Sequence, residues 1–502
     1  MRKRPSTYPN KPARGLSSPQ EGLALVITLI ALALFSLLGF YVAFRSTTEV
    51  RISDNYESAI QARFAALAGL DHARELLRGL NFDDQLRGPD GTYDNSSAYL
   101  SQARMFSFRN PIPWTTARSL NIFDPAADVA GIPDDGLLNT GKIGSSSGTV
   151  LIPLAGIAQT VPDPYGPGMI TISRYFVKVS DNNREASEIA RDAADNPFLD
   201  GDRVIIVRSL GVARTIREST SGRDHWNSIA VFEAQLKRRG TFKLKAALVV
   251  QGIDVQPCAS AMFDGTSFQV RGDAGNPGIA TIDVDPGDLV SPANQISSLV
   301  ASDQQGNISG MGLTPSIRDI TAPVSADADT SLLLRKDFLS NFAGSDVPGF
   351  ADNNFQGNQS WSTGTAPDLG NYDPSLPMND SGQRPKVTLV NGDLSIGDGI
   401  AGGGLLVVTG RLIVSGRFAF NGLILIVGKG EMEAYGMNPG VRGGIYLASL
   451  LGSSGQLNWG TARLTLSRDS AITIDGPSVE MAISLIPPAQ LSMREITGAQ
   501  DP

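Results

Sequence analysis

The chain has 502 residues, of which 41% are hydrophobic and only 18% are charged, and it contains 54 glycines and 30 prolines. This composition favours turn-rich β structure, excludes a coiled-coil rod and, at this length, suits about three domains. The net charge of −8 argues against a general nucleic-acid coat, so we expect no nucleic-acid partner. A single cysteine and two histidines exclude an internal disulfide, a cysteine-rich metal site and a histidine cage.

The N-terminus joins a cationic flank to a long apolar segment. Residues 1–22 contain five basic residues and one acid, a net charge of +4, and residues 23–44 contain no charge. These 22 residues are long enough to span a bilayer as a helix, with the flank in the cytoplasm. A cleaved secretory signal is the alternative, but no small-x-small site follows the apolar run. The residues expected to lie in the lipid include Leu23, Val26, Ile27, Leu29, Leu32, Phe35, Leu38, Phe40 and Phe44.

The same helix is expected to continue beyond the membrane. Residues 49–78 contain no proline, and Gly79 is suited to the C-cap. A helix over residues 23–78 would be roughly 80 Å long. A plain single-pass anchor with a long juxtamembrane helix is the simplest alternative. The helical period predicts one face that packs against a soluble domain, formed by Ile52, Tyr56, Ala59, Ala66, Leu67, Leu70 and Leu77.

Three stretches of this helix carry a family resemblance. Residues 20–26 (QEGLALV) resemble the class III leader and hydrophobic start of type IV pilin-like proteins. Residues 48–55 (TEVRISDN), followed by residues 61–70, resemble the N-terminal domain of PilX-type pilus assembly proteins, or minor pilins.

This resemblance implies cleavage between Gly22 and Leu23 by a prepilin peptidase, so that the apolar helix is retained and becomes the packing core of a filament. It implies other pilins or pseudopilins as partners and the bacterial inner membrane as location, with the N-terminus cytoplasmic and the head periplasmic. It also implies methylation, cell adhesion, and a place in the pilus or at the cell surface after assembly.

Two positions depart from the family pattern. A standard pilin has Glu at the fifth mature position, where its carboxylate neutralises the N-terminal amine of the neighbouring subunit, and this chain has Ile27. The same departure resembles the K-type pseudopilin of type II secretion, which sits at a tip. PilX-type helices usually read Ala-Glu-Ala-Gly, and Leu67 replaces the Glu here. Both departures set the chain apart from a major pilin.

The predicted fold class is α+β, with a pilin-like head over residues 81–240. Residues 81–167 read as loops with short strands, because Asn, Asp, Gly and Pro punctuate them. Residues 169–180, 203–214 and 228–238 are three β-rich runs, which we expect to form an antiparallel meander. The meander should pack on the long helix, since a helix cannot bury its apolar face alone.

Two further domains are expected after a composition shift at Arg239-Gly240. Residues 241–385 should form a mixed β and loop domain with one helix, over residues 331–342.

Residues 386–502 contain a glycine-rich β repeat. The triplets 390–392, 408–410 and 426–428 recur every 18 residues, and residues 404–408 align with residues 422–426. Gly444 follows after an apparent insertion of four residues. This period predicts a short parallel β-helix, with ordinary hairpins as the alternative.

Motifs that could carry chemistry are weak. Residues 397–402 (GDGIAG) match a dinucleotide fingerprint, but a strand-like run follows them where the motif needs a helix. Residues 181–183, 200–202 and 327–331 contain oxygen donors for calcium, and hydrogen-bonded Asx turns are the commoner role of such residues. We therefore expect no cofactor and assign no metal.

Nucleophilic and acid–base sites are no better supported. Residues 144–148 (GSSSG) loosely match a nucleophile elbow, and only His72 and His225 could serve as its base. Cys258 is expected to be a buried, inert thiol. Asp393 and Asp398 lie on the repeat, where a carbohydrate-active β-helix could use paired carboxylates. We expect turn carboxylates instead, and assign no catalytic residue.

The sequence thus predicts a minor pilin or pilus assembly protein, processed at Gly22 and placed at the pilus tip or in initiation. One alternative is a K-type pseudopilin. The other is a membrane-anchored β-helix protein that acts on surface polysaccharide.

Overall fold

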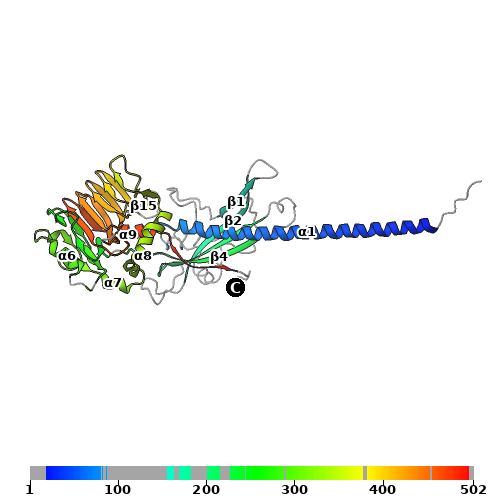
Figure 1. The fold of residues 1–502 in the computed structure, drawn as a ribbon, viewed down its shortest axis with the longest axis horizontal. Coiled ribbons are helices and arrows are strands. Elements are labelled where there is room, and N and C mark those ends of the chain that lie inside the picture. The colour runs from blue at the N-terminus through cyan, green and yellow to red at the C-terminus, as the bar shows by residue number, and fades with distance from the viewer. Residues whose placement is uncertain are drawn as a thin grey trace, which may run out of the picture.

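The computed structural model describes residues 19–80, 82, 86, 155–162, 169–182, 200–214, 227–243, 245–285, 287, 290–376, 382–452 and 455–496. In this part of the chain, helix α1 (Pro19–Leu76) leads into two β-rich bodies that follow one another along its direction (Figure 1). We call the first body the head: the C-terminal part of α1 with the sheet packed on it. The second body, residues 245–486, is the repeat domain.

The head contains a five-stranded antiparallel sheet on which α1 lies. Its strand order is β1-β2-β3-β4-β24, and the meander expected from residues 169–238 is present as β2 to β4. The strands are β1 (Ala155–Pro162), β2 (Met169–Asp181), β3 (Val204–Ala213), β4 (Ser228–Lys237) and β24 (Ala489–Ile496).

Glycines bring the backbones of α1 and β3 into direct contact. A Cβ atom on Gly211 of β3 would lie 1.9 Å from the carbonyl oxygen of Ala62. A Cβ atom on Gly69 of α1 would lie 2.1 Å from Oγ of Ser209. Neither position has room for a side chain, so the helix and the sheet pack at this distance only because both residues are glycine.

The buried face of the long helix agrees in part with the expected one, since Ala66, Leu70 and Leu77 are buried and Leu67 is half-buried. Ile52 and Tyr56 were assigned to it, but they are 63% and 69% exposed. Ala59 is exposed too. Where β3 approaches closely, up to Gly69, the helix buries small residues, and leucines join the buried face only after that position. The residues that the head buries on α1 are Ser58, Ala62, Ala65, Ala66, Gly69, Leu70, Ala73, Leu76 and Leu77.

The repeat domain is inserted between two neighbouring strands of the head sheet. The chain leaves the head at the end of β4 and returns in β24, where Ala489 pairs with Lys237. Our assignment of residues 489–496 to the repeat is therefore wrong. Buried Glu233 of β4 holds the returning strand, because its carboxylate accepts hydrogen bonds from Arg208 of β3 at 2.6 Å and from Arg494 of β24 at 2.8 Å.

The repeat domain is built on two sheets, one of 12 strands and one of 7. The larger contains β5 (Leu248–Gly252), β8 (Gln269–Arg271), β9 (Ile279–Asp283), β10 (Ile308–Ser309), β11 (Ile317–Asp319), β12 (Asn353–Gln356), β14 (Gly370–Asn371), β15 (Arg384–Asn391), β17 (Ile400–Val408), β19 (Phe418–Gly428), β21 (Gly440–Ser449) and β23 (Ala471–Ile474). The smaller contains β6 (Val255–Gln256), β7 (Phe263–Asp264), β13 (Gln359–Trp361), β16 (Leu394–Ile396), β18 (Arg411–Val414), β20 (Glu431–Tyr435) and β22 (Ala462–Ser467).

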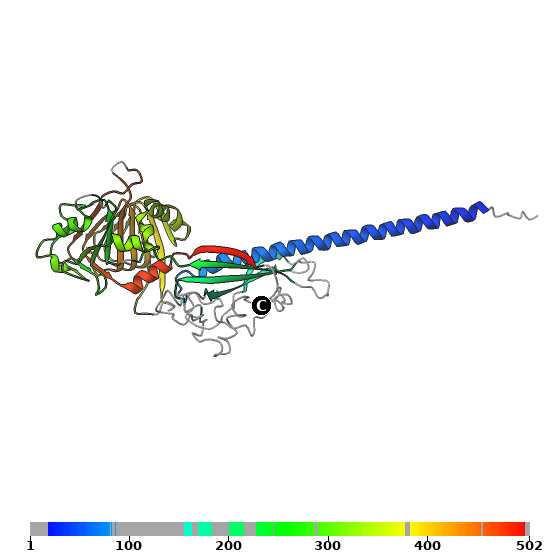
Figure 2. The same ribbon diagram turned by 90° about the horizontal axis from the view of Figure 1, so that it is seen from below.

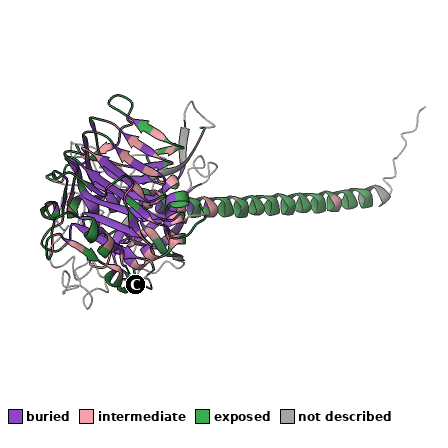
Figure 3. Ribbon diagram, turned by 60° about the vertical axis from the view of Figure 1, so that its left-hand side comes forward, coloured by how far each residue is buried: buried purple, intermediate pink, exposed green. Residues whose placement is uncertain are grey.

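The chain alternates between these two sheets in a parallel arrangement. Strands β15, β17, β19 and β21 pair in parallel in the larger sheet, and β16, β18, β20 and β22 do so in the smaller one. Leu405 lies opposite Leu423, 18 residues later. One apolar core fills the space between the sheets, and it includes Leu406, Ile424 and Leu464 (Figure 3, purple).

Helices cover the other face of the larger sheet. Phe342 and Ala482 pack there against a second core that contains Val407 and Leu425. The helices of this domain are α6 (Pro292–Leu299), η2 (Gln305–Asn307), α7 (Thr321–Ala326), η3 (Thr330–Leu334), α8 (Lys336–Asn341), η4 (Phe342–Asp346), η5 (Val347–Gly349) and α9 (Gly476–Ser484). The single helix expected over residues 331–342 is divided at Arg335, and α6, α7 and α9 were not predicted.

The expected boundary at residue 386 is absent. Strand β5 pairs in parallel with β21 and with β9, so residues before 385 and after 386 share one sheet and one core. Local composition changes near residue 386, but pairing between segments far apart in the sequence decides the domain.

A row of glycines aligns the turns. Gly404, Gly422 and Gly443 lie opposite one another, with φ angles of +132°, +152° and +139°. A Cβ atom on Gly422 would lie 2.0 Å from the carbonyl oxygen of Gly404. Gly443 pairs with Gly422, and Gly444 lies opposite Leu423. The last repeat is therefore 21 residues long (443 − 422 = 21), against 18 for the one before it. The insertion has three residues and not the expected four.

We expect the substitution Gly422→Ala to lower the free energy of unfolding by at least about 2 kcal/mol, since it combines a strained φ with a backbone clash. Chemical denaturation of the purified protein measures it. Gly476→Ala is the matched control, because no atom lies within 4 Å of the new methyl group and the residue opens α9. Equal stability of Gly422→Ala and wild type would contradict the register described here.

Candidate functional sites on the long helix and at the domain junction

The first half of α1 is an exposed apolar rod. It is the one helix in the described part of the chain that is long and apolar enough to cross a membrane. Leu23 and Phe44, at the two ends of the uncharged run, are both 63% exposed. The hydroxyl of Thr28 donates to the carbonyl of Ala24 at 2.8 Å, so the polar atom is satisfied within the helix. All nine residues assigned to the lipid lie on this exposed rod: Leu23, Val26, Ile27, Leu29, Leu32, Phe35, Leu38, Phe40 and Phe44.

The predicted processing junction lies in the first turns of the same helix. Gly22 and Leu23 belong to α1, which begins at Pro19. Ile27 follows one turn later, and no acid lies near it on the helix, because residues 23–44 are uncharged.

Apolar exposure continues past the uncharged run. Ile52, Tyr56 and Phe64 are each more than 60% exposed, although they lie on the same continuous helix as the buried face of the head. An ion pair at 3.0 Å between Arg45 and Glu49 marks the first charges after the run. The exposed apolar surface therefore extends from the rod to the edge of the head.

The C-terminal end of α1 is fastened to the repeat domain. The Nε atom of Arg78 donates to the carbonyl of Leu485 at 2.9 Å, and its guanidinium lies 5.7 Å from the ring centre of Phe350. Arg74 donates at 2.9 Å to the carbonyl of Pro488, which lies in the short segment between the repeat domain and β24. Gly79, which has the left-handed φ of +69° suited to the predicted C-cap, donates its N–H to Ser484. These bonds fix the head and the repeat domain against each other.

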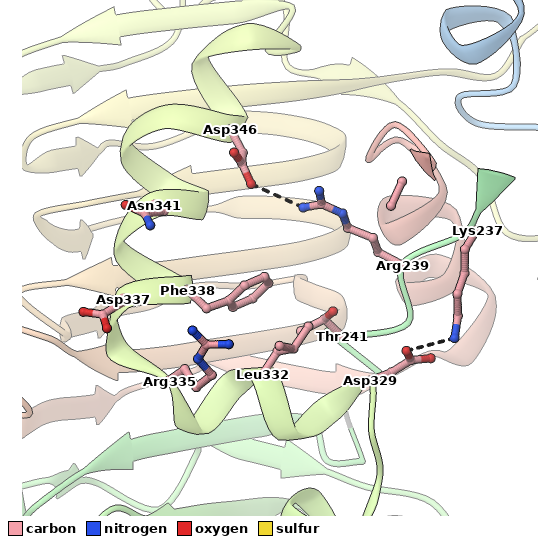
Figure 4. A pocket seen from close by; sticks show the side chains of 11 residues that line it. Lys237, Arg239, Thr241, Asp329, Leu332, Arg335, Asp337, Phe338, Asn341 and Asp346 are labelled. Atoms are coloured by element: carbon pink, nitrogen blue, oxygen red, sulfur yellow. Dashed lines mark hydrogen bonds and ion pairs between the residues drawn. The ribbon is translucent and has the colours of Figure 1, made fainter. Parts of the chain in front are cut away.

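A cleft of about 490 Å³ opens beside this junction (Figure 4). We call it the junction cleft. Two ion pairs cross it, from Lys237 to Asp329 and from Arg239 to Asp346, each at 3.3 Å. Its lining comes from the end of the head sheet, the connection after β4 and the helical cover of the repeat domain: Lys237, Arg239, Thr241, Asp329, Leu332, Arg335, Asp337, Phe338, Asn341, Asp346 and Ala489.

The carboxylates on the repeat are bound by cations. Arg417 forms an ion pair with Asp398 at 2.9 Å and lowers the pKa of Asp398 to about 2. Partial burial alone would raise the pKa of Asp393, but hydrogen bonds from Lys429 and from the backbone N–H of Arg411 outweigh it and lower that pKa. Both groups stay ionised at neutral pH, which does not suit the general acid of a glycosidase.

The other motifs form local structure. Residues 400–408 form strand β17, so the glycines at 397–402 introduce no helix N-terminus. Asp200 and Asp202 accept the backbone N–H groups of Arg203 and Val204, and Asp327 accepts that of Asp329, as in Asx turns. Among the described residues no group of three or more His, Cys, Asp or Glu could hold a metal ion. Residues 144–148 and His225 lie outside the described residues.

The two remaining nucleophile and base candidates lie in different bodies. Nδ1 of His72 is 2.5 Å from the hydroxyl of Tyr175, within the packing of α1 on the head sheet. Cys258 belongs to the repeat domain and is half-buried, not buried as expected; its thiol donates to the carbonyl of Met432 at 3.4 Å. Burial, reinforced by the charge of Glu431, raises the pKa of Cys258 to about 11. This environment disfavours the thiolate that a cysteine nucleophile needs.

Sequence reasoning did not find the junction cleft. Its lining residues come from segments that are far apart in the chain, and no motif connects Arg239 with Phe338. The one local signal was the composition shift at residue 239, which coincides with the chain leaving the head.

Because of its raised pKa, Cys258 should react slowly with thiol reagents at pH 8. At pH 8 the thiolate is then about one part in a thousand of the thiol. A more basic thiolate is also more nucleophilic, which offsets part of this loss. We therefore expect Cys258 to be alkylated at least about tenfold more slowly than an unhindered cysteine. Timed iodoacetamide labelling with mass spectrometry measures the rate. The same protein in denaturant serves as control and should react at the ordinary rate, whereas equally fast labelling of the folded protein would refute the inert assignment.

Comparison with known proteins identifies the N-terminal segment. Residues 21–71 match the family described as PilX N-terminal. No curated protein matches the chain. Among solved structures, the competence-associated pilin ComZ from Thermus thermophilus is similar at 13% identity, over 87% of this chain and 97% of that one, with a TM-score of 0.17. So low a TM-score establishes neither fold nor function.

Proposed function

We propose that this chain, whose N-terminal segment is that of the PilX-type, type IV pilin-like proteins, is a minor pilin at the tip of a type IV pilus. The observation that supports it most directly is the match of residues 21–71 to the PilX N-terminal family on a helix whose apolar half is exposed. An exposed apolar surface of this kind must be covered by lipid or by other apolar helices. In this proposal the membrane covers it before assembly, and the helices of neighbouring pilins cover it in the filament core.

The proposed membrane topology and processing follow from the leader. Residues 1–22, with a net charge of +4, stay on the cytoplasmic side of the inner membrane, and the head and repeat domain lie in the periplasm. A prepilin peptidase cuts between Gly22 and Leu23. The helix then leaves the bilayer sideways into the filament with its apolar residues still covered.

The shape of the protein supports a place at the tip. The repeat domain lies beyond the C-terminal end of α1, on the side away from the N-terminus (Figure 2). In a filament built from parallel helices, the next subunit toward the tip would occupy the space beyond the C-terminal end of α1. A large body there is compatible with the last position of the stack. Ile27 fits the same position, because a subunit without the carboxylate cannot neutralise the amine of a neighbour stacked beyond it.

The repeat domain is, in this proposal, a short parallel β-helix. Three observations support it: parallel pairing in both sheets, the 18-residue period between Leu405 and Leu423, and one core between the sheets. Such a domain presents a rigid surface at a distance from the membrane.

A K-type pseudopilin of type II secretion is the second candidate, and Ile27 is the residue that favours it. It differs from the first only in the machine that the subunit joins. The fibre with which the protein co-purifies, pilus or pseudopilus, distinguishes the two.

We expect the mature protein to begin at Leu23 only where a prepilin peptidase is present, and to remain in the membrane fraction in both cases. N-terminal mass spectrometry with and without the peptidase measures this. Gly22→Val should block cleavage, and Gly39→Ala is the matched control, since its new methyl group meets no atom of the chain. A chain that still begins at Met1 despite the peptidase, or one that begins after Phe44, would refute the pilin assignment.

A tip subunit should also be labelled at one end of each fibre. Immunogold electron microscopy with antibodies against the repeat domain is the measurement, and a major pilin antibody that decorates the whole length is the control. Labelling at intervals along the fibre would contradict the tip position while leaving the pilin assignment intact.

A further inference from the structure

The junction cleft has the size and the walls of a small-ligand site. Its volume of about 490 Å³ lies within the usual range for such sites. Leu332 and Phe338 line it and are half-buried, so each presents apolar surface to whatever enters. Residues from the head, from the connection after β4 and from the repeat domain all contribute to the lining, which the bonds of Arg74 and Arg78 hold in place.

Three cations and three carboxylates line the cleft, and two ion pairs leave Arg335 and Asp337 as the charged residues of the lining that form none. Figure 4 shows the guanidinium groups of Arg239 and Arg335 on either side of the Phe338 ring. Asp329 and Asp346 are each neutralised by an ion pair with Lys237 or Arg239. Arg335 is exposed, and no described residue forms an ion pair or hydrogen bond with its side chain.

The remaining polar groups lie around this cation. Asp337 and Asn341 are at the outer rim, on the side of the helix that is turned away from Arg239 (Figure 4). Thr241 supplies a hydroxyl opposite them. The cleft therefore offers one unpaired guanidinium, an aromatic face and several single hydrogen-bonding groups, which suits a ligand with one carboxylate, a ring and hydroxyls.

The junction cleft has few of the groups that bind an extended peptide. Recognition of an extended peptide relies on a free strand edge with unpaired N–H and C=O groups. The two strand residues in the lining, Lys237 and Ala489, pair with each other in the head sheet. A sugar ring needs no such edge, since a flat aromatic face and separate polar side chains are enough.

We propose that the junction cleft binds an acidic sugar, with the carboxylate of a uronic acid residue held by Arg335 and its ring packed on Phe338. In this arrangement the planar fork of Arg335 meets the carboxylate with two N–H donors, and Thr241 bonds to a hydroxyl group.

Isothermal titration of the full-length protein in detergent with trigalacturonic acid tests the proposal. We expect saturable binding that weakens with added salt, and the variant Arg335→Gln should raise the Kd by about tenfold or more. Arg335→Lys should recover only part of the affinity, because it keeps the charge and loses the fork. Arg271→Gln on β8, another exposed arginine outside the cleft, is the control and should leave the Kd within about twofold of wild type.

Several outcomes would overturn the proposal. They are no binding of trigalacturonic acid, equal binding of the neutral galactotriose, or an unchanged Kd in Arg335→Gln. Tighter binding of tetraglutamate than of trigalacturonic acid would show an acidic peptide site instead. Since Arg335 has no partner to lose, an unchanged melting temperature of Arg335→Gln confirms that the fold is intact. The assignment as a pilin does not depend on any of these results.

Discussion

The backbones of α1 and β3 touch, and the rest of the molecule depends on that contact. Gly69 and Gly211 leave no room for side chains between the helix and the sheet, so the small residues of α1 form its buried face. Leu70 and Leu76 are buried as well, but the large apolar residues before Gly69 are not. Ile52, Tyr56 and Phe64 remain exposed beside the head and continue the apolar rod that begins at Leu23. The packing that builds the head thus leaves further apolar residues exposed on the same helix beyond the uncharged run.

A second constraint is the double connection to the repeat domain. The chain leaves the head from β4 and re-enters it next to the same strand in β24, and buried Glu233 bonds with arginines on both neighbouring strands. Arg74 and Arg78 of α1 add direct bonds to residues 485 and 488. The repeat domain is connected to the head by two chain segments and is hydrogen-bonded to the end of the long helix. It therefore keeps a fixed orientation, unlike a domain on a single linker. The large domain is therefore held beyond the end of the helix.

The charged groups of the repeat domain serve its structure. Asp393 and Asp398 hold neighbouring turns together through Lys429, Arg411 and Arg417, and their low pKa values follow from those bonds. At the junction, by contrast, Arg335 stands without a partner beside an aromatic ring. This difference is why the cleft, and not the surface of the repeat, is the place where we expect a ligand.

The sequence by itself determined those features that depend on neighbouring residues. The uncharged run at residues 23–44, the cationic flank, the meander over residues 169–238 and the 18-residue period were all evident, because hydrophobic and turn residues encode them locally. The PilX-type segment was recognised in the same way. The buried face of the long helix was recognised in part: Ala66, Leu70 and Leu77 are buried as expected, but Ile52 and Tyr56 are exposed. A helical period does not tell whether the partner surface demands large or small side chains.

Tertiary structure alone decided the domain boundaries and the candidate cleft. Pairing of β5 with β21 merges residues on both sides of position 386 into one domain, and pairing of β24 with β4 returns the end of the chain to the head. The cleft brings Arg239 together with Phe338 and Ala489. These contacts join segments that are far apart in the chain. They depend on hydrogen bonds and packing between whole strands and helices, which the pattern of neighbouring residues in the sequence does not reveal.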